Sequence, residues 1–193
     1  MARSQKEYGF GFTACNAMLP EFCNIARLIN DGTPPGEIDP SIIGRGKLST
    51  NKRYLGELTR RMRSLTPEQI ELLAEGSLDD QKNITHLALC KTYSMYHDFV
   101  TDVLLEKTRV YDLQLTDLDY NSFVSRKSID HPELDEITSK THEKIRQVIH
   151  RMLQQTGLID SVNKPAILIP SLSVRAETVI INDHNELLKC FLR

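Results

Sequence analysis

The sequence SLDDQKNITHLALCKTYSMYHDFVTDVLLEK, residues 77–107, decides the fold. Its apolar residues recur at helical intervals, so that they gather on one face of an α-helix. That face is broad, and a broad apolar face is typical of a helix buried in a core. We therefore expect one long helix, or two in succession, at the centre of the molecule. The residues of this face are Ile84, Leu87, Ala88, Met95, Phe99, Val103 and Leu104.

Helical stripes also precede this central stretch. Residues 18–29 carry one apolar stripe, and the pattern ends at Gly32. Residues 48–65 carry a second stripe, for which Ser49 or Thr50 is the expected N-cap. The second of these helices has an apolar face and a basic face.

A capping sequence marks the next helix. Thr66 is an N-cap residue, Pro67 follows at the first helical position, and Gln69 stands three residues after the cap. This is the pattern of a capping box. The sequence predicts a short helix here that closes at Gly76.

Similar signals recur in the second half of the chain. Asp130 and Pro132 predict a short helix, and Thr138 or Ser139 is expected to cap a longer one soon afterwards. Gly157 is expected to end that longer helix. A short helix and a long helix are thus joined by a tight break.

The remaining segments have weaker patterns. Residues 111–125 are expected to be helical, although their apolar spacing is less regular. Residues 158–169 are the one place where a small hairpin is expected, because residues 163–165 separate two short apolar runs. Ser173 and Asn182 are expected to cap two final helices.

Length and composition bound the fold class. The chain has 193 residues, of which 40% are apolar, and this fraction excludes a disordered chain. A sheet needs several apolar runs bounded by turns, and only residues 166–169 resemble one. The sequence therefore predicts an all-α fold in which residues 1–193 form one globular unit.

Other features concern the compartment and the cofactors. Residues 1–12 lack the apolar run of a secretory signal, and no uncharged apolar stretch of ~20 residues occurs. The four cysteines lie far apart without a CxxC pair, so we expect buried thiols in a reducing compartment. A cytoplasmic protein with no membrane association, no metal site and no cofactor is predicted. The cysteines are Cys15, Cys23, Cys90 and Cys190.

The formal net charge of −2 conceals a strong segregation of charge. Residues 45–63 hold seven basic side chains and one acidic side chain, a net charge of +6. Residues 137–151 hold four basic side chains and one acidic side chain, a net charge of +3. Residues 64–136 hold six basic and fifteen acidic side chains, a net charge of −9. The basic segments either bind an anionic partner or pack against the acidic middle.

Both basic segments occupy the same predicted position. Residues 33–65 and 128–157 each read as a short helix, a tight break and a longer basic helix, which is the order of a helix-turn-helix element. In such an element the second helix lies in the major groove of DNA and its first turns contact base edges. The predicted DNA-binding residues are Lys47, Asn51, Lys52, Arg53, Arg60, Arg61, Lys140, His142, Lys144 and Arg146.

Signatures of catalysis do not occur in the sequence. It lacks the glycine-rich phosphate loops, the nucleophile elbow G-x-S-x-G and the zinc motif H-E-x-x-H. Asp183, Glu186 and Lys189 imitate a metal-nuclease set, but no strand carries them. We therefore predict a binding protein and not an enzyme.

The second half of the chain resembles the C-terminal signature of the BrxA family, the small A component of bacteriophage exclusion (BREX) phage-defence systems. In the first half, an aromatic and glycine-rich opening, Glu21 in an apolar helix, and the segments 48–53 and 58–65 agree with the same family. The residues that carry the resemblance are His131-Pro132-Glu133-Leu134, the run from Thr138 to Val148, Met152-Leu153, Gly157-Leu158-Ile159 and Ile169-Pro170.

This resemblance implies a cytoplasmic, all-helical protein with two helix-turn-helix elements flanked by positive surface. It implies binding of double-stranded DNA within a system that methylates host DNA and blocks phage replication. Methyltransferase and ATPase activities belong to other components of such systems, which would be its partners. The family supplies no catalytic residue for this chain.

Two other functions stay open at this point. The acidic residues 64–136 would serve a protein-interaction scaffold as a docking surface for other defence components. A helical RNA-binding protein is less favoured, because only 12 of the 193 residues are aromatic and none is Trp, so base-stacking surfaces are scarce. No sustained heptad pattern occurs, and a monomer is expected.

Overall fold

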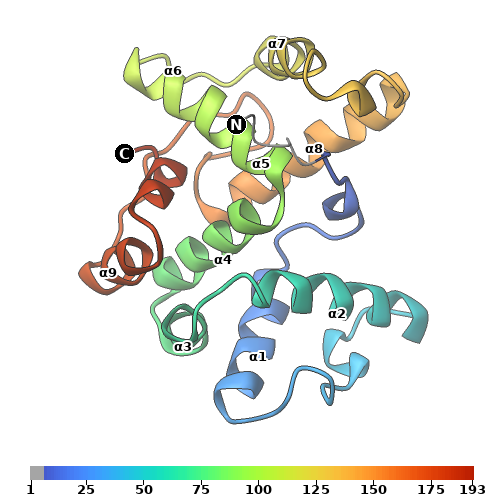
Figure 1. Ribbon diagram of the computed structural model, residues 1–193, viewed down its shortest axis with the longest axis vertical. Helices are drawn as coiled ribbons and strands as arrows, with labels where there is room; N and C mark the ends of the chain where they lie inside the picture. The colour runs from blue at the N-terminus through green and yellow to red at the C-terminus, as the bar shows by residue number, and fades with distance from the viewer. Residues whose placement is uncertain (1–6) are drawn as a thin grey trace, which may run out of the picture.

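A computed structural model describes residues 7–193, so residues 1–6 of the opening lie outside it. Within the described residues the regular structure is helical, which confirms the all-α prediction (Figure 1). The α-helices are α1 (Leu19–Asn30), α2 (Leu48–Met62), α3 (Pro67–Glu75), α4 (Leu78–Thr92), α5 (Ser94–Phe99), α6 (Leu105–Arg109), α7 (Asp117–Lys127), α8 (Ser139–Thr156) and α9 (Val174–Asp183). Shorter turns are η1 (Gly11–Ala14), η2 (Pro40–Ile43), η4 (Pro132–Leu134) and η5 (Asn185–Phe191), which are 3-10 helices, and η3 (Val100–Leu104), a π-helical turn.

The central stretch forms two helical rods in succession. The first rod is α4, and it ends where Tyr93 adopts an extended conformation (φ −121°, ψ 103°). The second rod runs without interruption through α5, η3 and α6. Ile84, Leu87 and Phe99 on these rods have no exposed surface, so the predicted broad apolar face lies in the core.

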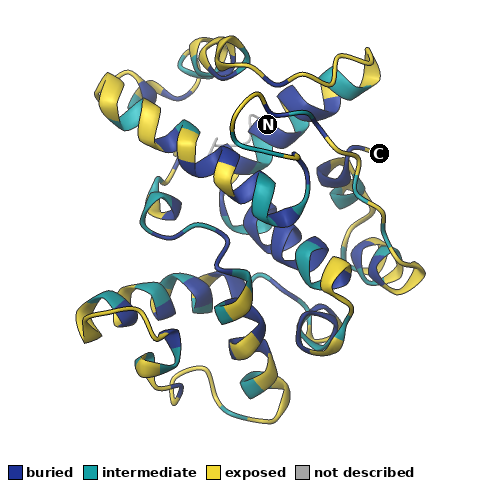
Figure 2. Cartoon of the chain, turned by 180° about the vertical axis from the view of Figure 1, so that it is seen from behind, coloured by how far each residue is buried: buried dark blue, intermediate teal, exposed yellow. Residues whose placement is uncertain are grey.

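The other helices surround these two rods. In Figure 1, α1, α2 and α3 lie at one end of the molecule and α6 and α7 at the other, while α8 crosses α4. Buried residues line the inner faces of the central helices, and exposed residues cover the outer faces at both ends (Figure 2). The buried apolar residues form one connected core.

Most predicted caps agree with the structure. Thr66 and Gln69 form the capping box of α3, and the Thr138 hydroxyl accepts a hydrogen bond from the Thr141 backbone N–H at the start of α8. Gly157 ends α8 in a left-handed conformation (φ 83°). Ser173 caps α9, as predicted, by accepting a hydrogen bond from the Ala176 backbone N–H. These ends follow from local sequence alone.

Two predicted caps are wrong. Ser49 and Thr50 do not cap α2, because Gly44 and Gly46 turn the chain through left-handed conformations and Lys47 then leads directly into the helix. Asn182 does not start a helix, because α9 continues through it to Asp183. The η5 turn is instead capped by His184, whose Nδ1 accepts a hydrogen bond from the Glu186 backbone N–H.

The prediction of a helix over residues 111–125 is wrong in its first part. Tyr111 is in a left-handed conformation (φ 58°), and helix α7 begins only at Asp117. Between these points the chain is extended, and Gln114 forms an antiparallel bridge with Ala166.

The expected hairpin within residues 158–169 is present only as an isolated bridge. Ile159 and Ile167 form an antiparallel bridge, supported by the hydrogen bond from Leu168 N–H to the Leu158 carbonyl at 2.8 Å. Together with the Gln114–Ala166 bridge, it makes three short extended segments that lie side by side.

A buried arginine joins three parts of the fold. The Arg61 side chain on α2 has no exposed surface. Its Nη atoms donate to the carbonyl oxygens of Cys15, Asn16 and Ala17 at 2.8–3.0 Å, and its Nε donates to the Tyr93 hydroxyl at 2.9 Å. This guanidinium therefore fixes α2 against the N-terminal segment and against the end of α4.

We expect Arg61→Ala to lower the free energy of unfolding by about 3 kcal/mol or more, because it leaves three buried carbonyl oxygens without their charged donor. Arg61→Lys keeps the charge but not the fork geometry, and we expect an intermediate loss. Arg63→Ala is the matched control, since Arg63 is an exposed arginine directly after the same helix and its removal should change stability by no more than ~0.5 kcal/mol. Urea unfolding followed by circular dichroism measures all three, and equal stabilities of the Arg61 and Arg63 variants would contradict the assignment.

A buried histidine predicts how stability depends on pH. His86 on α4 lies against the Tyr96 hydroxyl at 3.1 Å and the Cys190 carbonyl at 2.8 Å. Burial lowers the pKa of His86 from 6.5 to about 4. Between those two pH values the unfolded chain binds a proton that the folded chain excludes, so acidification removes stability.

We therefore expect the free energy of unfolding to fall by up to about 3 kcal/mol between pH 6.5 and pH 4 on account of His86. Comparison with His86→Phe isolates this contribution, because the acidic side chains titrate equally in both proteins. The measurement is urea unfolding at a series of pH values. Parallel pH profiles for the two proteins would show that His86 is not the responsible group.

Candidate nucleic-acid interface

The first basic segment exposes one face of α2. Exposed positions on this helix recur at intervals of three and four residues, opposite the buried positions. Lys52 and Arg53 form no ion pair with any residue in the described range 7–193, and Lys47, just before the helix, is likewise exposed and unpaired there. Arg60 is half-exposed and pairs with Glu57 at 3.1 Å. The exposed stripe consists of Ser49, Lys52, Arg53, Gly56, Arg60 and Arg63.

Two residues predicted to contact DNA from this segment are buried. Arg61 has no exposed atom and serves as the internal anchor described above. The side chain of Asn51 is also buried, and its Oδ1 accepts a hydrogen bond from the Arg45 backbone N–H at 3.2 Å. Asn51 therefore fixes the turn at residues 44–46, which contains Gly44 and Gly46, against α2. A buried side chain that is already bonded inside the chain does not contact a duplex, so we leave Asn51 and Arg61 out of the interface.

The second basic segment exposes one face of α8. Lys140 and Lys144 are exposed and form no ion pair within residues 7–193. Gln147 and Arg151 continue the same face at helical spacing. This face stands opposite the buried positions that pack against the core, so its side chains point to solvent.

Two predicted residues on α8 have internal partners instead. The Nε2 atom of His142 lies 2.9 Å from the Leu134 carbonyl and ties the η4 turn to α8. Arg146 is half-buried, and it forms an ion pair with Asp117 at 2.5 Å, which joins α8 to the start of α7. Both side chains position α8 and are not free for an external partner.

The predicted boundaries of the helix pairs differ from the observed ones. In residues 33–65 the helix before α2 is only the four-residue turn η2, and in residues 128–157 the helix before α8 is only the three-residue turn η4. The full helix that packs beside α8 is α7, which begins at Asp117. Proline starts both short turns, and neither sequence continues in a helical pattern after them.

An aromatic cluster holds α8 against its neighbours. Phe99 on α5 meets Phe123 on α7 edge to face, with ring centroids 5.3 Å apart. The centroid of Phe99 lies 6.1 Å from that of Tyr120 on α7 and 6.4 Å from that of His150 on α8. Three helices therefore share one core, and the three short extended segments lie at the end of α8.

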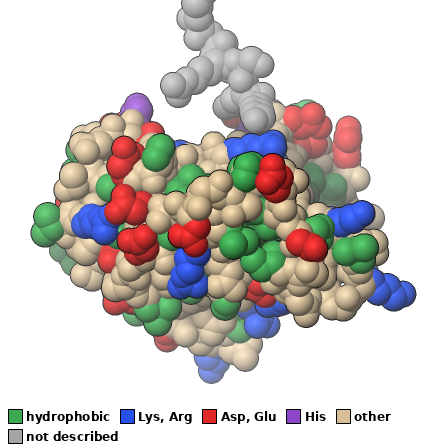
Figure 3. Space-filling view, turned by 90° about the horizontal axis from the view of Figure 1, so that it is seen from below, with side chains coloured by type: hydrophobic (Ala, Val, Ile, Leu, Met, Phe, Trp, Pro, Cys, Tyr) green, Lys and Arg blue, Asp and Glu red, His purple; other side chains and the backbone are tan. Residues whose placement is uncertain are grey.

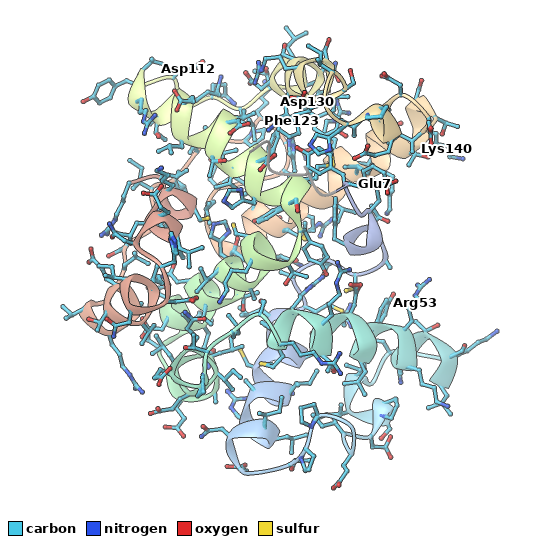
Figure 4. All side chains as sticks on the ribbon, viewed as in Figure 1. Glu7, Arg53, Asp112, Phe123, Asp130 and Lys140 are labelled. Carbon is cyan, nitrogen blue, oxygen red and sulfur yellow. The ribbon has the colours of Figure 1, made fainter. Side chains whose placement is uncertain are left out.

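The N-terminal ends of the two basic helices lie on the same side of the molecule. Arg53 on α2 and Lys140 on α8 both lie at the right of Figure 4, where the N-terminal ends of these helices are found. Figure 3 shows the end of the molecule that lies lowest in Figure 1, and there Lys and Arg side chains are interspersed with Asp and Glu side chains. The cationic character therefore belongs to particular helix faces and not to a whole hemisphere.

The structure adds residues that are not in the predicted set of DNA-binding residues. Arg63, Gln147 and Arg151 lie on the exposed helix faces, and Lys164 lies in the exposed loop between two extended segments. The signal for the first three was available, because they fall opposite the apolar stripes of their helices. Lys164 carried no such signal, since its position beside α8 depends on the bridge between Ile159 and Ile167.

Comparisons with known proteins agree with this arrangement. The BrxA family model matches residues 6–184 of the chain. A BREX protein BrxA of Bacillus cereus (strain H3081.97) is 24% identical over 144 residues, which cover 72% of each chain. A BREX protein BrxA of Escherichia coli O9:H4 (strain HS) is 24% identical over 121 residues, covering 63% of this chain and 57% of that protein. The crystal structure of an uncharacterized protein from Magnetospirillum magneticum shares the fold, with a TM-score of 0.83 at 18% identity over 96% of this chain and 98% of that one.

Proposed function

The chain belongs to the BrxA family of BREX phage-defence proteins, and from this premise we propose that it is a non-catalytic component that binds double-stranded DNA. In such a system the methyltransferase and ATPase activities would come from other components. Within residues 7–193, no helix is long and apolar enough to cross a membrane.

One observation carries the proposal. Two helices that are distant in sequence present cationic side chains on the same side of the molecule, and these side chains form no ion pair within residues 7–193. Phosphate contacts from Lys and Arg supply most of the affinity of a protein for DNA regardless of sequence. The four side chains best placed for such contacts are Lys52, Arg53, Lys140 and Lys144.

The elements around α8 support the same function. An extended segment near Gln114, then α7, α8 and two further extended segments follow each other in the order of a winged helix. In a helix-turn-helix arrangement the second helix of the pair lies in the major groove. We propose α8 as the groove-binding helix and residues 161–165 as the flanking loop.

We expect Lys140→Glu with Lys144→Glu, and separately Lys52→Glu with Arg53→Glu, to weaken duplex binding by at least about tenfold, because each pair loses two phosphate contacts. The slope of log K against log salt should become shallower by about 2 in each double variant. Fluorescence anisotropy of a labelled 20-base-pair duplex at several salt concentrations measures both quantities.

The control for this experiment is Arg109→Glu. Arg109 is an exposed cation that pairs with Glu106 on α6, at the far end from α2. The control should bind duplex within about twofold of the unmodified protein, since it lies on neither stripe. If the unmodified protein does not bind duplex even at low salt, the proposal is wrong.

A second candidate function is the docking of another defence component. Val110 and Tyr111 are strongly exposed, with Tyr111 91% exposed, and Leu113 beside them is also exposed. Contiguous exposed apolar side chains mark interaction surfaces. The neighbouring Asp112 forms an ion pair with Lys107 at 2.6 Å, so its negative charge is partly neutralised inside the chain. We propose the apolar segment 110–113, and not the carboxylates, as the contact.

If this candidate is correct, Val110→Ser with Tyr111→Ser reduces co-purification of co-expressed components of the system by at least fivefold, while duplex affinity is unchanged. Ile129→Ser is the matched control, because Ile129 is an exposed apolar residue elsewhere on the surface. Undiminished co-purification with the double variant rules out this segment as the dock.

A further inference from the structure

A cavity of about 830 Å³ lies between α8 and the extended segments. Its walls are residues 114–117, the middle of α8 from Arg146 to Arg151, and the loop 162–165. This volume is within the range of small-ligand sites, which is roughly 300–1,000 Å³. The cavity is therefore large enough to hold a small organic molecule and not only water.

The charged side chains of the cavity favour an anion. Arg151 and Lys164 are exposed and form no ion pair within residues 7–193. Arg146 also lines the cavity, but its charge is balanced by Asp117. The lining therefore offers two unbalanced positive charges, which match a phosphate monoester carrying a charge near −2.

The wall beside these cations includes a histidine that is closed off from the cavity. His150 contributes to the lining but is only 6% exposed, and its Nε2 is enclosed by protein atoms. Burial, together with the positive charge of Arg146, lowers the pKa of His150. The cationic part of the cavity therefore consists of Arg151 and Lys164.

The other walls suit a ring system. Leu115, Val162 and Pro165 form an apolar part of the lining, next to the amide side chains of Gln147 and Asn163. Apolar walls accept the face of a heterocyclic base, and amides hydrogen-bond its edge. A simple phosphate ion would use only the cationic part of this cavity.

We propose that the cavity between α8, residues 114–117 and residues 162–165 binds a nucleoside monophosphate, with the phosphate at Arg151 and Lys164 and the base against the apolar wall. The same chemistry is found in a free mononucleotide and in the phosphorylated 5′ end of a DNA strand. The inference goes beyond duplex binding, since the ligand is one nucleotide with a terminal phosphate.

The probe is dAMP, titrated into the full chain labelled with ¹⁵N and followed by NMR. We expect dAMP to shift the amide resonances of residues 114–117, 146–151 and 162–165, and to bind at least tenfold more tightly than either deoxyadenosine or inorganic phosphate. Arg151→Gln with Lys164→Gln should weaken dAMP binding at least tenfold.

Lys52→Gln with Arg53→Gln is the control, because it removes the same charge from α2 and should leave dAMP binding unchanged. A DNA hairpin with a 5′-phosphate, compared with the same hairpin ending in a hydroxyl, separates the two sources. Tighter binding of the phosphorylated hairpin than of the hydroxyl hairpin assigns the strand end, and equal binding of the two hairpins assigns the free nucleotide.

Three results would overturn the inference. The first is that dAMP, dGMP, dCMP and TMP all fail to shift these resonances at 10 mM. The second is that inorganic phosphate binds as tightly as dAMP. The third is that the Arg151 and Lys164 variant binds dAMP like the unmodified protein. Duplex binding by the α2 and α8 stripes is measured separately. A failure of duplex binding therefore leaves the conclusion about dAMP unchanged, and a failure of dAMP binding leaves the conclusion about duplex binding unchanged.

Discussion

The rest of the structure depends on one buried cation. Arg61 sits on the apolar side of α2, and burying its charge is tolerable only because three backbone carbonyls and the Tyr93 hydroxyl accept its hydrogen bonds. Those acceptors belong to the N-terminal segment and to the end of α4. The constraint fixes the rotation of α2 about its own axis, because only one orientation brings the guanidinium to them. That rotation in turn directs Lys52 and Arg53 to solvent.

The sequence was sufficient for elements whose causes are local. The boundaries of α3 and α8 follow from Thr66, Gln69, Thr138 and Gly157, each of which acts on its own helix end. The extended segment around Gln114 was not predictable in the same way. Its hydrogen bonds join residues about fifty positions apart, and no local pattern encodes such a bridge.

Charge and helical position together separate the exposed side chains of the basic segments from the buried ones, which charge alone does not. Asn51 precedes Leu55 by four residues and Leu58 by seven, so it falls on the buried stripe of α2. His142 likewise falls on the stripe of Ile145 and Ile149, and its ring bonds to a backbone carbonyl instead of facing outward. Helical geometry therefore identifies the buried side chains of a basic segment. It does not identify the groups that form hydrogen bonds with those buried side chains.

The distribution of ion pairs argues against the explanation that the basic helices neutralise the acidic middle. If the basic helices existed to neutralise the acidic middle, their side chains would pair with it. Among residues 7–193 only Arg146 with Asp117 joins a basic segment to residues 64–136. Four carboxylates of the acidic middle instead pair with its own lysines, since Lys107 pairs with Asp112 and Asp119, and Lys127 pairs with Asp98 and Asp102. The cations of α2 and α8 therefore keep their charge available to an external anion, and a near-zero net charge is compatible with two strongly cationic helix faces.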